Sequence, residues 1–126
     1  MSLAEYFETA EGLGVLATSD AQGNVDAAIY ARPYVIDENT VAFSMAERLS
    51  YANIQSNAKA AYLFVEIGEG YHGQRLYLTK TSEETDAHKI EAIKATRPST
   101  RKSSGAKKHL IYFTVDKVRP LTGSSP

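Results

Sequence analysis

The chain has 126 residues, of which 43% are hydrophobic and 23% charged, and its formal net charge is -1. This length and composition are typical of one globular domain, which we expect to span residues 1–126. The near-neutral charge argues against a nucleic-acid-binding protein, which would carry a basic excess. The lack of cysteine excludes disulfides, thiolate metal sites and a cysteine nucleophile.

No apolar run reaches the roughly 18 residues that a membrane-spanning helix needs, so we expect no membrane partner. The N-terminus does not combine a basic segment with an apolar one, as a signal peptide does. We therefore expect a cytoplasmic protein. The low-complexity tail at 122–126 predicts a flexible end.

In chain order, the pattern predicts one short helix and then strands grouped as hairpins. Ser2 and Glu5 match a capping box, S-x-x-E, which predicts a helix over 3–9. Compact apolar runs bounded by turn residues predict strands. We expect six of them, at 13–18, 25–36, 40–45, 60–67, 74–79 and 109–117. Apolar residues at helical spacing predict two further helices, at 46–57 and 83–96.

Two stretches interrupt this pattern. Pro33 lies inside the strand predicted at 25–36, and because proline cannot donate to a ladder, it marks an edge, a bulge or the place where a barrel splits. The basic stretch at 97–108 is predicted as a loop. Such a charge run is either a solvated loop or a flap that attracts an anion, and the sequence leaves both interpretations open.

The predicted order of strands and helices favours a mostly antiparallel sheet. Three short helices cannot cover both faces of a flat sheet with six strands, whereas a sheet that curls into a barrel covers one face by itself. We therefore predict a mainly β protein, a six-stranded antiparallel barrel with peripheral helices.

Three stretches resemble the pyridoxamine 5'-phosphate oxidase-like FMN-binding split barrels. They are the hairpin at 14–18 and 25–30, the segment 45–57 with the strand after it, and 70–76. The resemblance implies a homodimer with FMN at the subunit interface, its phosphate bound after the third strand and its ring along the second and third strands. The site residues that the resemblance implies are Arg48 and Ser50 at the phosphate, Arg32 beside the ring, and Tyr51 and Asn53 completing the pocket.

The chemistry of these residues agrees with the resemblance. A phosphate needs a cation, hydroxyl donors and free backbone N–H groups, and Arg48 and Ser50 at the start of a helix offer them. The alternative is a solvated Arg48 and a plain N-cap at Ser50. Arg32 likewise has two interpretations, as a donor to the polar edge of a flavin or as an outward-facing residue that protects an edge strand.

The resemblance further implies an FMN-dependent oxidoreductase with a small-molecule substrate. In such a protein the flavin carries the hydride or electrons and the chain orients it, so no catalytic side chain is predicted. The longer C-terminus with which true oxidases of this group grip their substrate has no counterpart here, so we do not expect vitamin B6 chemistry.

Other ligands on the same fold are alternatives to FMN turnover. They are haem, with His72 or His109 as the axial ligand, a deazaflavin in place of FMN, and a flavin held without turnover. His72, His88 and His109 lie 16 and 21 residues apart, which does not predict a metal cluster.

Overall fold

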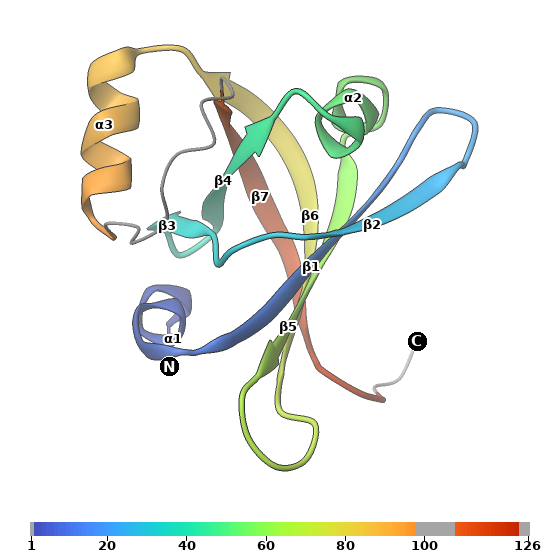
Figure 1. The fold of residues 1–126 in the computed structure, drawn as a ribbon, viewed down its shortest axis with the longest axis vertical. Helices are drawn as coiled ribbons and strands as arrows, with labels where there is room; N and C mark the ends of the chain where they lie inside the picture. Colours follow the sequence, from blue (N-terminus) through green and yellow to red (C-terminus); the bar gives the residue numbers. More distant parts are fainter. Residues whose placement is uncertain (1, 98–107, 124–126) are drawn as a thin grey trace.

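The structure, a computed structural model, describes residues 2–97 and 108–123. Within these residues a seven-stranded antiparallel sheet has the order β2-β1-β5-β6-β7-β4-β3 (Figure 1). The strands are β1 (Gly12–Ser19), β2 (Val25–Ile29), β3 (Tyr34–Asp37), β4 (Thr40–Ala46), β5 (Lys59–Glu66), β6 (Gly73–Glu84) and β7 (Lys108–Pro120). The helices are α1 (Leu3–Thr9), α2 (Leu49–Ser56) and α3 (Ala87–Ala95). The mainly β fold class is confirmed.

The predicted number of strands is wrong by one. The region 25–36 forms two strands, β2 and β3, separated by residues 30–33. Pro33 has no N–H to donate to a ladder, so a single strand cannot run through this position within a sheet. The described sheet therefore has seven strands in place of the six predicted.

The long strands β6 and β7 also differ from the prediction. β6 runs beyond Thr79, where its pairing with β5 ends, because it keeps β7 as a neighbour up to the pair Glu84 and Leu110. Register shifts in the β6–β7 ladder mark bulges, which bend strands and increase their twist. The helix predicted at 83–96 therefore begins later, after the N-cap Asp86.

The first two helices follow the local sequence closely. The helix predicted at 3–9 is confirmed, and Ser2 Oγ accepts a hydrogen bond from the backbone N–H of Glu5 at 3.2 Å. α2 is shorter than the helix predicted there. β4 continues to Ala46, and Arg48 keeps an extended backbone with φ -126° as the N-cap.

The core lies on the inner face of the curled sheet and is aromatic at its centre. Phe43 packs against Tyr62 and Phe113, with ring centres 4.9 and 5.8 Å apart. α1 contributes the buried Phe7 and α2 the buried Ile54. The other members of the core cluster are Leu16, Val41, Met45, Phe64, Leu76, Leu78 and Ile111. α1 and α2 thus belong to the core, whereas α3 has no buried residue and stands beside the barrel (Figure 1).

The sheet curls without closing. β2 and β3 are its two edges, although they follow each other in the chain. The β3–β4 ladder stops at the pair Tyr34 and Ala42, so within the described residues 43–46 have β7 on one side and no strand on the other. We call residues 30–33 and 43–46 the seam of the barrel.

Two predicted segments fall largely outside the described residues. They are the basic loop at 97–108 and the flexible tail at 122–126. None of the helices in the described ranges has the length and apolar character that crossing a bilayer requires.

Candidate functional site

The start of α2 carries two of the predicted site residues. Arg48 is its exposed N-cap and makes no side-chain capping bond. Ser50 lies in the first turn and is only 3% exposed. The first backbone N–H groups of a helix have no partner within it, and the helix dipole places a partial positive charge at the same end. This end of α2 therefore combines a cation, a hydroxyl group and backbone donors.

Tyr30, in the seam, adds a third side chain. Its hydroxyl lies near the Ser50 side chain and near the charge of Arg48, and both act on its pKa. Burial raises the pKa of Tyr30, and the opposing effects of Ser50 and Arg48 do not cancel it, so the phenol keeps its proton at neutral pH. The ring is held edge-on against Phe43 at 6.2 Å. The sequence analysis did not select Tyr30. It could have been found from its position, since it lies in the second predicted strand, along which the resemblance places the flavin ring.

Ser44, on the other side of the seam, has a buried hydroxyl with no hydrogen-bond partner among the described residues. Its neighbours Phe43 and Met45 point into the core, so the alternation of the strand turns Ser44 to the other face. The β3–β4 ladder has ended before this point, so in the described chain β4 pairs here with β7 on one side only. An unpaired buried hydroxyl calls for an explanation, of which a bound molecule is one.

The other two predicted residues of α2 have partners within the protein. Asn53 is buried, and its Nδ2 donates to Thr18 Oγ1 on β1 at 3.0 Å. The Tyr51 hydroxyl donates to Glu83 Oε1 on β6 at 2.8 Å, and its ring stacks on His109 with centres 4.4 Å apart. Both side chains thereby fix α2 on the barrel.

His109, at the start of β7, joins two carboxylates. Its Nδ1 lies 2.6 Å from Glu83 Oε2, and its Nε2 lies 2.7 Å from Glu47 Oε1. The hydrogen bonds to Glu47 and to Glu83 raise the pKa of His109. To serve as an axial haem ligand, His109 would have to release one of these carboxylates. His72, the other histidine considered for that role, is exposed between β5 and β6.

Arg32 lies in the seam, but its guanidinium reaches α1. Its Nη1 donates to the carbonyl oxygens of Phe7 at 2.8 Å and Ala10 at 2.7 Å. Arg97 in turn donates to the carbonyl oxygen of Arg32 and, at 3.0 Å, to that of Pro33. Burial, followed by the charge of Arg32, lowers the pKa of Arg97. Fastening the end of α1 was not among the roles that the sequence predicted for Arg32.

Comparison with known proteins identifies the fold. No protein-family model matches the chain, and no curated protein matches it at a significant level. A solved FMN-binding protein from Syntrophomonas wolfei subsp. wolfei is similar over 97% of this chain and 85% of its own, with a TM-score of 0.81 at 17% identity. HupZ from Group A Streptococcus is similar over 94% of this chain and 90% of its own, with a TM-score of 0.73 at 22% identity.

A third solved structure belongs to a Clostridium acetobutylicum protein related to general stress protein 26 of B. subtilis, of the pyridoxinephosphate oxidase family. It is similar over 94% of this chain and 87% of its own, with a TM-score of 0.66 at 14% identity. The chain has the fold of the pyridoxamine 5'-phosphate oxidase-like split barrels. The predicted resemblance is confirmed at the level of the fold. In this split barrel, Arg48, Ser50 and Tyr30 meet where α2 begins.

The outer face of the split barrel is apolar over β2, β1 and β5. The apolar side chains among those that point outward are Val25, Ala27, Ile29, Leu13, Val15, Ala17, Ala61, Leu63 and Val65, which we call the outer apolar face. Val25 is 82% exposed and Ile29 64%. A hollow of about 250 Å³ lies on this face, lined by Val15, Ala17, Ala61, Tyr62, Leu63, Arg75 and Tyr77. A contiguous exposed apolar face of this kind marks an interaction surface.

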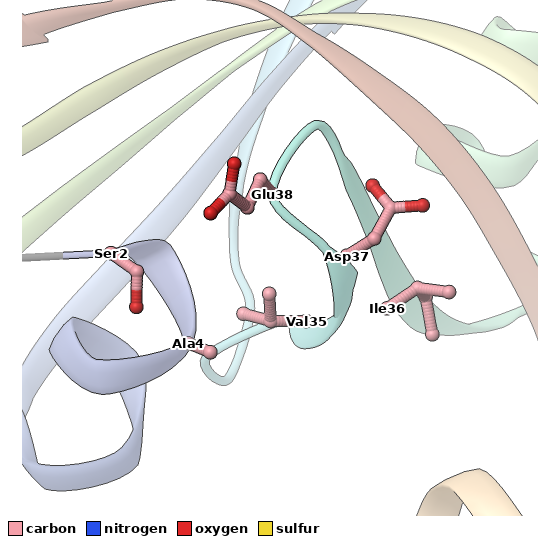
Figure 2. Close-up of a pocket in the computed structure, with 6 residues that line it drawn as sticks. All are labelled: Ser2, Ala4, Val35, Ile36, Asp37 and Glu38. Carbon is pink, nitrogen blue, oxygen red and sulfur yellow. The ribbon is translucent and has the colours of Figure 1, made fainter.

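A second hollow, of about 260 Å³, lies between α1 and β3 (Figure 2). It is lined by Ser2, Ala4, Val35, Ile36, Asp37 and Glu38. The carboxylates of Asp37 and Glu38 point away from each other (Figure 2). No group of three or more histidine and carboxylate side chains in the described ranges is arranged to hold a metal.

The start of α2 and the seam beside it form the candidate site of the split barrel, because Arg48, Ser50, Tyr30 and the unpaired hydroxyl of Ser44 lie there.

Proposed function

We propose that this chain binds FMN in the seam, as a homodimer, and works as an FMN-dependent oxidoreductase on a small-molecule substrate. The observation that carries the proposal is the cluster of Arg48, Ser50 and the Tyr30 hydroxyl at the start of α2. A phosphate monoester is a dianion rich in acceptor oxygens, and a cation, hydroxyl groups and helix N–H donors suit it. The FMN-binding protein with the same fold supports the choice of ligand.

The buried hydroxyl of Ser44 is the observation that bears on whether the seam also suits a flavin ring. A flavin carries donors and acceptors along one edge, and a serine hydroxyl can donate one hydrogen bond and accept two. The Ser44 hydroxyl has no hydrogen-bond partner among the described residues, and Ser44 lies on the stretch of β4 that has β7 on one side and no strand on the other. The donor set of the seam therefore fits a ligand with both a phosphate and a polar ring edge.

A bound flavin supplies hydride and electron transfer, so no side chain of this chain needs to act as an acid or a base. In the proposal, Arg48 and Ser50 hold the phosphate. Tyr30 keeps its proton because it is buried, and so presents a neutral hydroxyl there. Ser44 orients the ring.

The remaining residues expected at the site hold its elements in place and do not contact the ligand in this proposal. Arg32 fastens the seam to α1, while Tyr51 and Asn53 fasten α2 to the barrel.

The outer apolar face supports the proposed homodimer. Exposed side chains such as Val25 and Ile29 lose contact with water when a second copy covers them, which releases about 25 cal/mol for each Å² buried. A two-fold interface brings the same patch of both copies together. A face with few charges is suited to this arrangement because no like charges then oppose each other.

The first experiment is an absorption spectrum of the purified protein, followed by titration with FMN and with riboflavin, which lacks the phosphate. We expect FMN to bind more tightly. Arg48→Ala should weaken FMN binding about 10- to 100-fold, since a hydrogen bond to a charged group contributes about 1.5–3 kcal/mol, and should leave riboflavin binding unchanged. Lys89→Ala, which removes a positive charge from the exposed side of α3, is the matched control and should bind FMN normally.

Each other outcome changes a different part of the proposal. Equal FMN affinity in the wild-type protein and Arg48→Ala would contradict the placement of the phosphate. A strong Soret band in the purified protein would favour haem, and selective binding of a deazaflavin would replace FMN as the cofactor. Bound FMN that no reductant can bleach would argue for storage without turnover. A protein that binds none of these ligands would leave the fold without the function.

A further inference from the structure

His109 links three elements around the start of α2. It lies opposite Met45 of β4, and its side chain is only 11% exposed. Nε2 is 2.7 Å from Glu47, in the turn between β4 and α2, and Nδ1 is 2.6 Å from Glu83 on β6. The imidazole ring also stacks on Tyr51 of α2, with an angle of 23° between the rings.

These contacts require the protonated form of His109. An ionised carboxylate only accepts hydrogen bonds, so both ring nitrogens must donate, and a neutral imidazole has a single N–H. The hydrogen bonds to Glu47 and Glu83 raise the pKa of His109 above its ordinary value. The groups that face the ring are these two carboxylates and the phenol of Tyr51, with Lys80 acting on Glu83 from β6. The ring therefore keeps its proton at a pH where an ordinary histidine has lost it.

The two contacts on α2 and its turn lie on either side of Arg48. Glu47 directly precedes Arg48, and Tyr51 follows in the first turn. When His109 loses its proton, one carboxylate contact is lost. Glu47 is the one to leave, since its side chain is 62% exposed, while that of Glu83 is 26% exposed and also accepts from Tyr51.

We infer that cationic His109 is a positioning residue for the anion-binding start of α2, so that FMN binds more weakly once His109 is neutral. The inference rests on the proposed function for its ligand. Two effects act in the same direction. The first is structural: release of Glu47 frees the turn that carries Arg48. The second is electrostatic: the net charge of His109, Glu47 and Glu83 falls from one negative charge to two, and the added negative charge repels an anion.

The test is the affinity for FMN between pH 7 and pH 9. The second pKa of a phosphate monoester is about 6, so the charge of FMN is nearly constant over this range. We expect the wild-type affinity to fall about two- to fivefold as pH rises, the size of a partly exposed ion pair. His109→Gln keeps one donor but cannot be protonated, so its affinity should be pH-independent and close to the wild-type value at pH 9. His88→Gln, on exposed α3, is the matched control and should behave as wild type.

A second measurement separates this inference from the proposed function. In the wild-type protein without FMN, an NMR pH titration should show the backbone amides of Glu47 and Arg48 shifting with the same apparent pKa as the His109 ring. In His109→Gln these shifts should disappear. FMN binding with the same pH profile in wild type and His109→Gln would overturn the positioning role and leave the proposed function standing. Amide shifts that follow His109 in a protein that fails to bind FMN would support the positioning and reject the function.

Discussion

At the scale of single residues, Asn53 shows how a polar side chain can hold a helix on a sheet. Its amide donates to the hydroxyl of Thr18 at 3.0 Å, and both residues are at least 95% buried. Removing one partner leaves the other buried and unpaired, which costs more than the bond itself contributes. The pair therefore makes the position of α2 on β1 specific, and with it the position of Arg48.

Asn53→Ala should lower the free energy of unfolding by about 1–3 kcal/mol, because the Thr18 hydroxyl loses its buried partner. Urea unfolding measures this change. Thr18→Val removes the hydroxyl, so the double variant should cost less than the sum of the single ones. Strictly additive losses would show that the hydrogen bond does not couple α2 to β1. FMN affinity measured on the folded variants shows whether Asn53 also touches the ligand.

At the scale of elements, α3 is attached in an unusual way. Although it has nine residues, none of them is buried. The described contacts that hold its end are made by Arg97, which donates to the carbonyl oxygens of Arg32 and Pro33 and lies 4.8 Å from the ring centre of Tyr34. Since proline interrupts the ladder here, the side chain of Arg97, which directly follows the C-cap of α3, bonds to carbonyl groups that a neighbouring strand would otherwise reach.

Arg97→Ala should therefore release α3 without unfolding the barrel. We expect the backbone amides of α3 to exchange with solvent at least about tenfold faster, since hydrogen bonds to a charged group are lost, while those of β5 and β6 keep their protection. Hydrogen–deuterium exchange measures both sets in one experiment. Lys89→Ala on the same helix is the control. Unchanged exchange of α3 in Arg97→Ala would show that other contacts hold the helix.

At the scale of the whole molecule, the barrel has one covered face and one exposed apolar face. The inner face is filled by the aromatic core, whereas β2, β1 and β5 turn valine, isoleucine, leucine and alanine side chains outward. β2 is moreover an edge strand, and exposed apolar edge strands tend to pair or aggregate unless something covers them. A second copy of the chain would cover this face.

We expect the wild-type protein to sediment with twice the 13.8 kDa mass of one chain. Ile29→Glu places a charge on the outer apolar face, and desolvating that charge in an interface is costly, so this variant should be monomeric at micromolar concentration. Ile36→Glu, on β3 at the opposite end of the sheet, adds the same charge and should stay dimeric. Wild-type protein that sediments as a single chain would contradict the homodimer.

Local patterns in the sequence were enough to predict much of this fold. The capping box at Ser2, the alternation of apolar residues in the strands and the turns between them depend on neighbours in the chain, so the helix at 3–9 and the mainly β class follow from them. Arg48 and Ser50 were selected through the family resemblance of the segment 45–57, and they could be selected together because both lie in that one short segment.

Contacts between distant segments were decided only by the tertiary structure. The curling of the sheet brings Tyr30 to Ser50, carries Arg32 to the end of α1, and lets β6 continue along β7 past the end of β5. His109 meets Glu47 across 62 residues of chain. The sequence by itself therefore determined most of the local elements and which residue types could bind a phosphate. Which side chains meet at the seam depends on strand order and register, because hydrogen bonds between strands join residues that no local pattern relates.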